Sequence, residues 1–163
     1  MASKVLSSMV SYFEKDVRRI NHTLKVYGFA GAIMKGENLG AREALVVELS
    51  AVLHDIGIRE AEKKYNSAAG KYQELEGPPV AKALLAEAGI DSEIAERVCY
   101  IVGNHHSYGK IGGIDFQILV EADFLVNIFE EGLGSAEIKS IRNKYFKTCG
   151  GLGIINSMYE VEL

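Results

Sequence analysis

Tryptophan is absent from this chain of 163 residues, and proline and cysteine occur only twice each. The two cysteines, Cys99 and Cys149, are too few for a disulfide framework and too far apart for a paired metal motif, so we expect both to be reduced. No apolar stretch is long enough to span a bilayer, because acidic residues interrupt each one. The first residues also lack the apolar block of a signal peptide, so we expect a cytoplasmic protein that does not contact membranes.

A basic surplus is missing as well, since 18 Lys and Arg stand against 22 Asp and Glu, for a formal net charge of −4. Nonspecific nucleic-acid binding requires a basic face and is therefore not expected. A small anionic substrate held by a few local cations is compatible with this charge. With 48% apolar and 25% charged residues, the composition is that of a globular protein, and the length fits a single domain over residues 1–163.

Helical periodicity dominates the chain, because apolar residues recur at steps of three and four with little proline to interrupt them. The pattern predicts an all-α protein with helices near residues 6–20, 22–33, 43–56, 78–88, 92–106, 116–129 and 136–146. We expect Pro78 and Pro79 in the first turn of their helix and Gly57 at the C-terminal cap of the 43–56 helix. The polar residues 58–73 read as a surface excursion, and the glycines after residue 149 as the start of a short tail.

All four histidines of the chain lie on or beside apolar stripes, and two aspartates are embedded in the same helical surfaces. These residues are His22, His54, Asp55, His105, His106 and Asp123. Burying an unpaired ionised carboxylate is costly, so each acid needs a cation or hydrogen bonds. A divalent metal would serve both acids and the neutral imidazoles at once, and two nitrogens with two carboxylates leave coordination positions open for water and substrate. This mixed set suits Fe, Mn, Co, Ni or Zn better than Ca or Mg.

The order His22, then His54-Asp55, then Asp123 resembles the HD-domain superfamily of metal-dependent phosphohydrolases. The similarity runs over roughly residues 15–130 and includes Asn-His-Thr-Leu-Lys-Val, Leu-His-Asp-Ile-Gly and Glu-Ala-Asp-Phe-Leu-Val-Asn-Ile; the segment 101–106 is similar to a family helix that ends in a histidine pair. The resemblance implies a compact helical bundle of about six to seven helices, with a core near 15–130 and a C-terminal helix and tail at 135–163. It implies four metal ligands, namely His22, His54, Asp55 and Asp123.

The resemblance favours one metal ion. Family members with two metals usually carry two further histidines, whereas here the first of those regions holds Glu76 and only the second holds His105-His106. A second ion bound through Glu76 and one of these histidines stays open. Two branches of the family are not expected: the cyclic-dinucleotide hydrolases have a lysine directly after His-Asp-Ile-Gly, where this chain has Ile58, and the acidic pair of the guanosine-tetraphosphate hydrolases is missing.

The expected reaction is hydrolysis of a phosphate ester of a nucleotide or a similar small phosphorylated metabolite. A metal ion lowers the pKa of bound water from 15.7 to about 7 and so supplies a nucleophile at neutral pH. Asp55 would accept the proton of this water, as in related enzymes, and His105 or His106 would orient the phosphate or protonate the leaving oxygen. Candidate cations for the substrate are Arg59, Lys63, Lys64 and Lys110, each of which is individually typical of a solvated surface charge.

Three alternatives stay open at this point. The same ligand order, with extra histidines, also resembles the di-iron oxygenases built on this fold, which would require two bound irons. A non-catalytic metal-binding regulatory module would retain metal without turnover. An ordinary helical protein with a buried polar network would bind no metal. The sequence leaves the exact substrate and the oligomeric state open.

Overall fold

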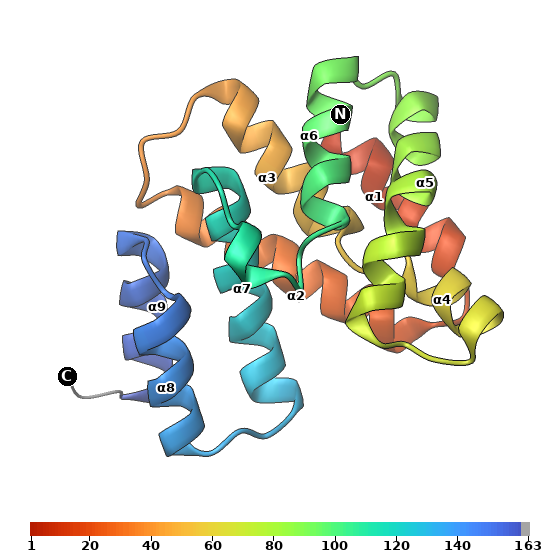
Figure 1. The fold of residues 1–163 in the computed structure, drawn as a ribbon. Helices are drawn as coiled ribbons and strands as arrows, with labels where there is room; N and C mark the ends of the chain where they lie inside the picture. Colours follow the sequence, from red (N-terminus) through yellow and green to blue (C-terminus); the bar gives the residue numbers. More distant parts are fainter. Residues whose placement is uncertain (161–163) are drawn as a thin grey trace.

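The computed structural model describes residues 1–160, which contain nine α-helices, one 3₁₀ turn and no strand (Figure 1). The elements are α1 (Ala2–Phe13), α2 (Val17–Met34), α3 (Ala41–Leu53), α4 (Ile58–Tyr65), α5 (Gly70–Ala88), α6 (Ser92–Val102), η1 (Tyr108–Lys110), α7 (Ile114–Glu130), α8 (Ser135–Tyr145) and α9 (Cys149–Tyr159). The all-α prediction is confirmed. The helices outnumber the expected six to seven because α4 and α9 form where a surface excursion and a tail were expected; residues 161–163 of that tail lie outside the described residues.

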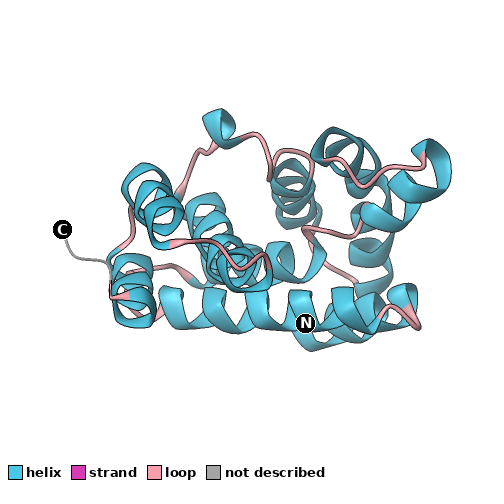
Figure 2. Ribbon diagram, turned by 90° about the horizontal axis from the view of Figure 1, so that it is seen from below, coloured by secondary structure: helices cyan, strands magenta, loops and turns pink. Residues whose placement is uncertain are grey.

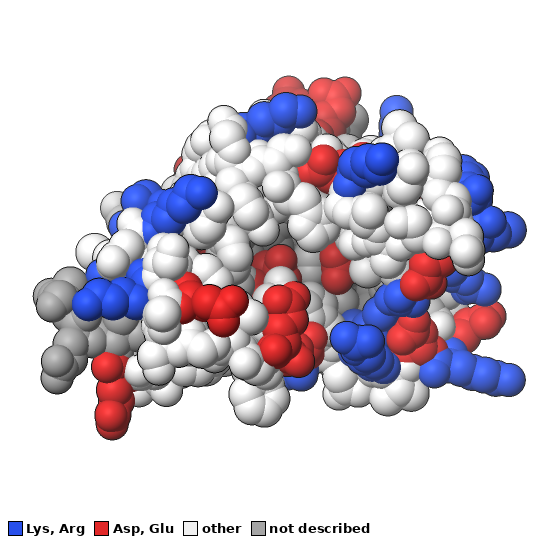
Figure 3. All heavy atoms as spheres, turned by 60° about the horizontal axis from the view of Figure 1, so that its bottom comes forward, with Lys and Arg blue, Asp and Glu red and all other residues white. Residues whose placement is uncertain are grey.

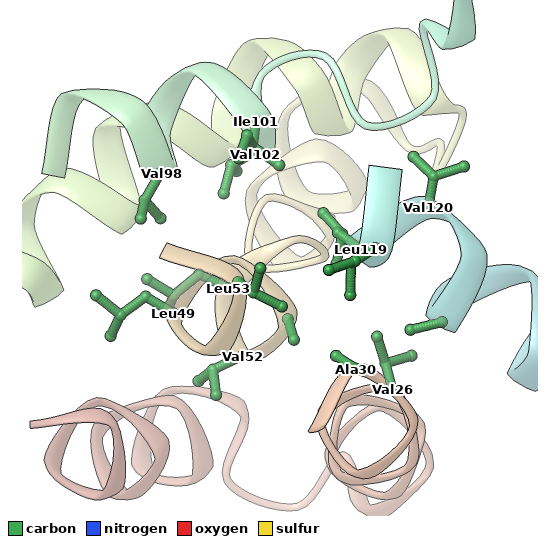
Figure 4. Packing of buried hydrophobic residues seen from close by; sticks show 14 of the residues in the cluster. Val26, Ala30, Leu49, Val52, Leu53, Val98, Ile101, Val102, Leu119 and Val120 are labelled. Atoms are coloured by element: carbon green, nitrogen blue, oxygen red, sulfur yellow. The ribbon is translucent and has the colours of Figure 1, made fainter. Parts of the chain in front are cut away.

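Helix α3 lies at the centre of the hydrophobic core. It packs against α1, α2, α6 and α7, and Leu49, Val52 and Leu53 are almost completely buried (Figure 4). Burying a side chain of this size stabilises a fold by roughly 1.5–3 kcal/mol. Because α3 is apolar almost all round, its neighbours fix it on every side. Its C-terminal end, where His54 and Asp55 follow, is therefore held in place by the core.

Helix α2 runs along one side of the bundle and packs against both α3 and α7 (Figures 1 and 2). Val26 and Ala30 of α2 are fully buried and share its inner face with His22, which lies one turn before Val26. Asp16 begins the helix, since its carboxylate accepts a hydrogen bond from the Arg19 N–H at 3.2 Å. The spacing of three and four that predicted this helix therefore also aims His22 into the interior.

Helix α7 carries Asp123 and is tied to the C-terminal helices by a buried acid. Glu121 is completely buried, and its Oε1 accepts hydrogen bonds from the backbone N–H of Lys147 at 2.6 Å and of Thr148 at 3.0 Å. The side-chain amide of Gln117 donates to the same oxygen at 2.7 Å. These donors satisfy the hydrogen-bonding needs of the buried carboxylate without a metal. These bonds hold the start of α9 against α7, and α8 and α9 lie together beside it (Figure 1).

The region between α3 and α5 differs from the sequence expectation. Residues 58–65 form α4, whose composition is polar because only Ile58 and Ala61 reach the core. Helix α5 begins at Gly70, so Pro78 and Pro79 lie in its interior rather than in its first turn. Proline has no N–H to donate to the carbonyl four residues earlier, so both prolines interrupt the hydrogen bonds within α5. The pattern failed here because prolines normally mark a helix start.

Gly57 has a different role from the predicted helix cap. Helix α3 ends at Leu53 with His54 at its C-cap, and Gly57, with a φ of −74°, is the N-cap of α4. A Cβ atom at Gly57 would lie only 2.5 Å from the carbonyl oxygen of Gln73 and 2.6 Å from the backbone nitrogen of Gly77. The glycine therefore allows the turn that carries His54 and Asp55 to touch the backbone of α5.

No helix within residues 1–160 combines the length and apolar character needed to cross a membrane.

Candidate metal centre

The structure brings together four side chains that are far apart in sequence. His22 comes from α2, His54 and Asp55 from the turn between α3 and α4, and Asp123 from α7. The Nε2 atom of His22 lies 3.2 Å from Asp123 Oδ1 and 3.5 Å from Asp55 Oδ2. His54 Nε2 lies 3.5 Å from the same Asp55 oxygen and 3.6 Å from Asp123 Oδ1. Two imidazoles and two carboxylates thus meet with their reactive atoms inward.

Two histidines are oriented by the ends of helices. The Nδ1–H of His54 donates to the Ala51 carbonyl at 2.9 Å, and the Nδ1–H of His105 donates to the Val102 carbonyl at 2.8 Å. Both acceptors lie in the last turn of a helix, where carbonyls lack a donor within the helix. The histidine three residues later supplies that donor. Its Nε2 atom then carries a lone pair, which points away from the helix end.

His22 is oriented by a carboxylate instead. Its Nδ1–H donates to Glu130 Oε2 at 2.9 Å, and Lys25 pairs with the other oxygen of Glu130 at 2.6 Å. Burial opposes ionisation of Glu130, but Lys25 and His22 lower its pKa. A carboxylate behind a histidine fixes the tautomer and makes the other ring nitrogen a better metal ligand. The Nε2 atom of His22 therefore also presents a lone pair to the cluster.

The cluster consequently contains acceptors without a donor. His22 Nε2 lies 3.3 Å from His54 Nε2, and with both Nδ1 atoms donating, neither neutral ring can place a proton between them. Asp123 Oδ1 and His105 Nε2 are buried and lack a hydrogen-bond partner within residues 1–160. Buried polar groups are normally satisfied, so this set of lone pairs calls for a cation. These residues fit a divalent transition metal, which accepts both imidazole nitrogen and carboxylate oxygen.

Without a cation, the same groups shift one another's protonation. Burial opposes a charged imidazole, yet Asp55 and Asp123 raise the pKa of His54 to about 9. Burial also opposes ionisation of Asp55, but His54 and His105 lower its pKa to about 2. The pKa of Asp123 is lowered by His22 and His54 in spite of its burial. Both acids are therefore ionised at neutral pH, and protons on the histidines would take the place of a metal.

A second group of potential ligands adjoins the first. Asp55, His105 and His106 each offer an atom within 4.8 Å of the others, as do His22, His54 and Asp123. Asp55 lies between the groups, since its Oδ1 is 3.4 Å from His105 Nε2 while its Oδ2 faces His22 and His54.

His106 is neutral at pH 7, because burial, with a smaller effect from His105, lowers its pKa to about 4. Its Nε2 atom lies 3.2 Å from Gln73 Oε1. The Gln73 amide donates to the Ala68 carbonyl at 2.7 Å, so its oxygen acts as acceptor and His106 Nε2 as donor. Glu74 accepts from the His106 backbone N–H at 3.0 Å and from Ser107 Oγ at 3.0 Å. A neutral, well-held ring favours a binding or orienting role over proton donation.

Glu76 does not join either group. Its carboxylate accepts hydrogen bonds from Lys64 Nζ and from Tyr65 OH, and these contacts lower its pKa. It faces α4 rather than the histidines, because Gln73, one turn earlier in α5, takes the position beside His106. The second group of ligands therefore forms without the predicted contribution of Glu76.

A cavity of about 500 Å³ opens beside the cluster. Its wall includes Asp16, Arg18, Arg19, His22, Asp55, Ile58, Ala68, Gln73, His106, Asp123, Asn127, Glu130 and Glu131. Helices α2 and α7, together with the cap residues Asp16 and Glu131 at their ends, supply eight of these thirteen residues, and α4 and α5 contribute Ile58 and Gln73. The candidate ligands and the cavity thus adjoin, which is the arrangement that chemistry on a bound substrate requires.

None of the four cations predicted to meet a substrate lines this cavity. Arg59 donates to the Tyr12 carbonyl and lies 5.4 Å from the centre of its ring. Lys64 pairs with Glu76, and Lys110 donates to Asn104 Oδ1 at 2.8 Å. Lys63 is exposed on α4. Long side chains near a motif in sequence follow the course of their own helix, which here carries them away from the cavity.

The cavity cations are Arg18 and Arg19, which the sequence analysis missed. They precede His22 by four and three residues in α2, and residues at these spacings share a face of a helix. The same spacing rule could have found them. Glu130 and Gln73 were also missed, because contacts across helices have no signal in a single sequence.

The model of the HD domain family matches residues 19–139, a range that includes the cluster and most of the cavity wall. The comparisons with curated proteins and with solved structures give no match. The family match covers well over half of the 163 residues and contains His22, the His54-Asp55 pair and Asp123 in the predicted order. The chain therefore belongs to the HD domain family.

Proposed function

We propose that this protein is a metal-dependent phosphohydrolase acting on a small phosphorylated metabolite. The observation that carries the proposal is the meeting of inward-facing lone pairs from His22 and His54 with the carboxylates of Asp55 and Asp123. Membership of the HD domain family supports it, as does the adjoining cavity of about 500 Å³. Known ligand pockets span about 300–1,000 Å³, so this cavity suits a metabolite of the size of a nucleotide or smaller.

The proposed metal ligands are His22 Nε2, His54 Nε2, Asp55 and Asp123. A bound divalent ion of Fe, Mn, Co, Ni or Zn would supply Lewis-acid activation of water and of a phosphoryl oxygen. The protein's own contribution is orientation: Glu130 holds the His22 ring, the Ala51 carbonyl holds the His54 ring, and the core holds α3.

The remaining roles follow from position and charge. Asp55 is ionised and borders both groups of ligands, so it is our candidate to accept the proton of the attacking water. His105 Nε2 faces Asp55 and could relay that proton or bind phosphate. For His106 we propose phosphate binding or metal ligation only, because its pKa of about 4 keeps the ring neutral at pH 7, so it is not an imidazolium acid.

One ion in the group His22, His54, Asp123 and Asp55 is the simplest occupancy. The second group, Asp55 with His105 and His106, offers a specific reason to consider two ions with Asp55 between them. A di-iron oxygenase on this fold is therefore the second candidate. It requires two irons per chain and oxygen consumption, whereas the phosphohydrolase requires neither.

Hydrolysis of phosphate esters with added divalent metals tests the proposal. The wild-type protein should release phosphate from at least one substrate of a panel of nucleotides and generic phosphate esters. His54→Ala and Asp123→Asn should abolish this release, while Glu96→Gln, an exposed change on α6 outside the cavity, should preserve it. Activity that survives both ligand substitutions would overturn the mechanism. Metal retention without turnover of any phosphate ester would point to a regulatory module instead.

A further inference from the structure

The charges that line the cavity are predominantly negative. Within the part of the chain that the structure describes, its wall contains five carboxylates and two guanidinium groups and includes no lysine. Figure 3 shows Asp and Glu side chains gathered in and beside a hollow near the middle of one face of the molecule. A cavity that binds a highly charged polyphosphate would need more positive than negative side chains, because phosphate groups are bound by Arg and Lys. The negative charge of the wall therefore limits how much negative charge a substrate can carry.

Most of the wall charges are already neutralised by partners. Arg19 pairs with Asp16 at 2.6 Å and with Glu62 at 2.6 Å, so it has little charge to offer a ligand. Glu130 pairs with Lys25 and with His22. Asp55 and Asp123 balance the two charges of the proposed divalent ion.

Two charged wall residues are left over. Arg18 and Glu131 are both exposed, and neither forms an ion pair within residues 1–160. Arg18 lies one turn before His22 in α2, and Glu131 lies two turns after Asp123 along α7. Among the described residues, the cavity thus offers one free cation for a phosphate and one free anion beside it.

Resting on the function proposed above, we infer that the substrate is a phosphate monoester whose alcohol part is neutral or cationic and carries hydrogen-bond donors. One phosphate group would bind at an open coordination position of the metal and pair with Arg18. Further phosphates would lie beside carboxylates, with no lysine to balance them. Asn127 and Glu131 follow Asp123 at spacings of four and eight, so they present an amide and a carboxylate along one face of α7 to hydroxyl or ammonium groups.

The reaction balances with water as the only co-reactant. The oxygen of water forms a new bond to phosphorus, and the bond between phosphorus and the alcohol oxygen breaks with its electron pair going to that oxygen. The alcohol oxygen takes up one proton of the water. The products are the free alcohol and hydrogen phosphate, and nothing is oxidised or reduced.

A paired comparison of substrates tests this inference. For one nucleoside, the 5′-monophosphate and the 5′-diphosphate should be measured with the metal-loaded protein, as should ethanolamine phosphate against glycolic acid phosphate. We expect kcat/KM to be about fivefold or more higher for the monophosphate than for the diphosphate. We expect the same advantage for ethanolamine phosphate over glycolic acid phosphate. One close charge contact in water is worth about that much. The preference should shrink as salt is added, because exposed charges are screened.

Charge reversal at Glu131 tests the role of the wall, and the same change at Glu96 is the matched control. Glu131→Lys should reduce both preferences about fivefold or more, because it reverses the free charge of the wall. Glu96→Lys makes the same change on α6 outside the cavity and should leave both ratios unchanged. Equal turnover of mono- and diphosphate by the wild type, or an equal response of the two variants, would overturn the inference.

Binding separates this inference from the proposed function. Calorimetry with inorganic phosphate and pyrophosphate on the metal-loaded protein requires no turnover. Tighter binding of phosphate than of pyrophosphate, reversed in Glu131→Lys, would uphold the charge selection even if no ester were hydrolysed, and only the proposed function would then fail. Tighter binding of pyrophosphate by the wild type would overturn the selection even if esters were hydrolysed.

Discussion

His22 and His54 face each other with Nε2 atoms 3.3 Å apart, while the Nδ1 atom of each ring donates away from the cluster. The partners of the two rings differ: a backbone carbonyl holds His54, whereas the side chain of Glu130 holds His22. Only the contact with Glu130 can be removed by substitution, because it is made by a side chain. The contribution of ring orientation to metal binding can therefore be measured at His22.

Removal of Glu130 should weaken metal binding. In Glu130→Ala the His22 ring loses the acceptor of its Nδ1–H, and loss of such an outer partner typically costs about 10–100-fold in metal affinity. Isothermal titration with Mn²⁺ or Zn²⁺ measures this change without any substrate. Glu131→Ala serves as the control, since it removes the neighbouring carboxylate, which has no contact with His22. Equal affinities of the two variants would contradict the assignment of Glu130.

The metal-free protein should lose stability as the pH rises above neutrality. The pKa of His54 is raised from an ordinary 6.5 to about 9, so the folded state binds its proton more tightly than the unfolded state. That stabilisation is complete below about pH 6.5 and disappears as the pH passes through about 9. Thermal unfolding in the presence of a chelator, from pH 5 to 9.5, should show this decline.

Asp55 gives an acid limb that lies below this pH range and is seen only when the measurement is extended to about pH 2. Its pKa is lowered to about 2, so its contribution to stability is complete above an ordinary 3.8 and is lost as the pH falls through about 2.

Metal should remove the alkaline decline in stability, because the ion replaces the protons on the histidines, and His54→Gln should flatten this decline. An unchanged alkaline decline in His54→Gln would contradict the proposed coupling.

Gly57→Ala should destabilise the fold beside the cluster. Its Cβ would lie 2.5 Å from the Gln73 carbonyl oxygen, and the obstacle is backbone, which yields less easily than a side chain. Overpacking of this kind costs about 1–3 kcal/mol in free energy of unfolding, as measured by urea denaturation. In the control Gly31→Ala, within α2, a new Cβ meets nothing within 4 Å, so that variant should be neutral or more stable. Equal stability of the two variants would contradict the close approach.

Arg18→Gln should impair substrate binding in the proposed hydrolase. Because Arg18 is the free cation of the cavity wall as described for residues 1–160, its loss should raise KM about fivefold or more at low salt, with metal affinity unchanged. Arg59→Gln and Lys110→Gln should leave KM unchanged, since both side chains are bonded elsewhere. An effect of Arg59 or Lys110 as large as that of Arg18 would restore the prediction made from sequence position.

The sequence predicted the helices and the residues that gather in the cluster better than it predicted the surroundings of the cluster. His22 and Asp123 could be found because each shares a periodic apolar face with core residues, and periodicity is a local property. Gly57 was misplaced because its neighbours belong to another helix: it touches the backbone at Gln73 and Gly77, which no local pattern records. Pro78 and Pro79 were misplaced because prolines normally mark a helix start, whereas α5 begins at Gly70.

The residues of the cavity wall could likewise be predicted from the sequence only in part. Arg18 and Arg19 could have been deduced from their spacing to His22, whereas Lys64 was given a substrate role that Glu76 prevents by pairing with it. Glu130 is 108 residues from His22 and joins it only because α2 and α7 pack together. Partners of this kind follow from the packing of helices and not from the order of residues.

The metal content of purified protein is the most direct measure of whether the facing rings of His22 and His54 share a cation. After loading with a mixture of divalent transition metals and removal of excess ions, elemental analysis should find at least one ion per wild-type chain. The double variant His54→Ala/Asp123→Asn should retain almost none, while Glu96→Gln should match the wild type. A wild-type chain that holds no metal, or a double variant that holds as much as the wild type, would contradict the account.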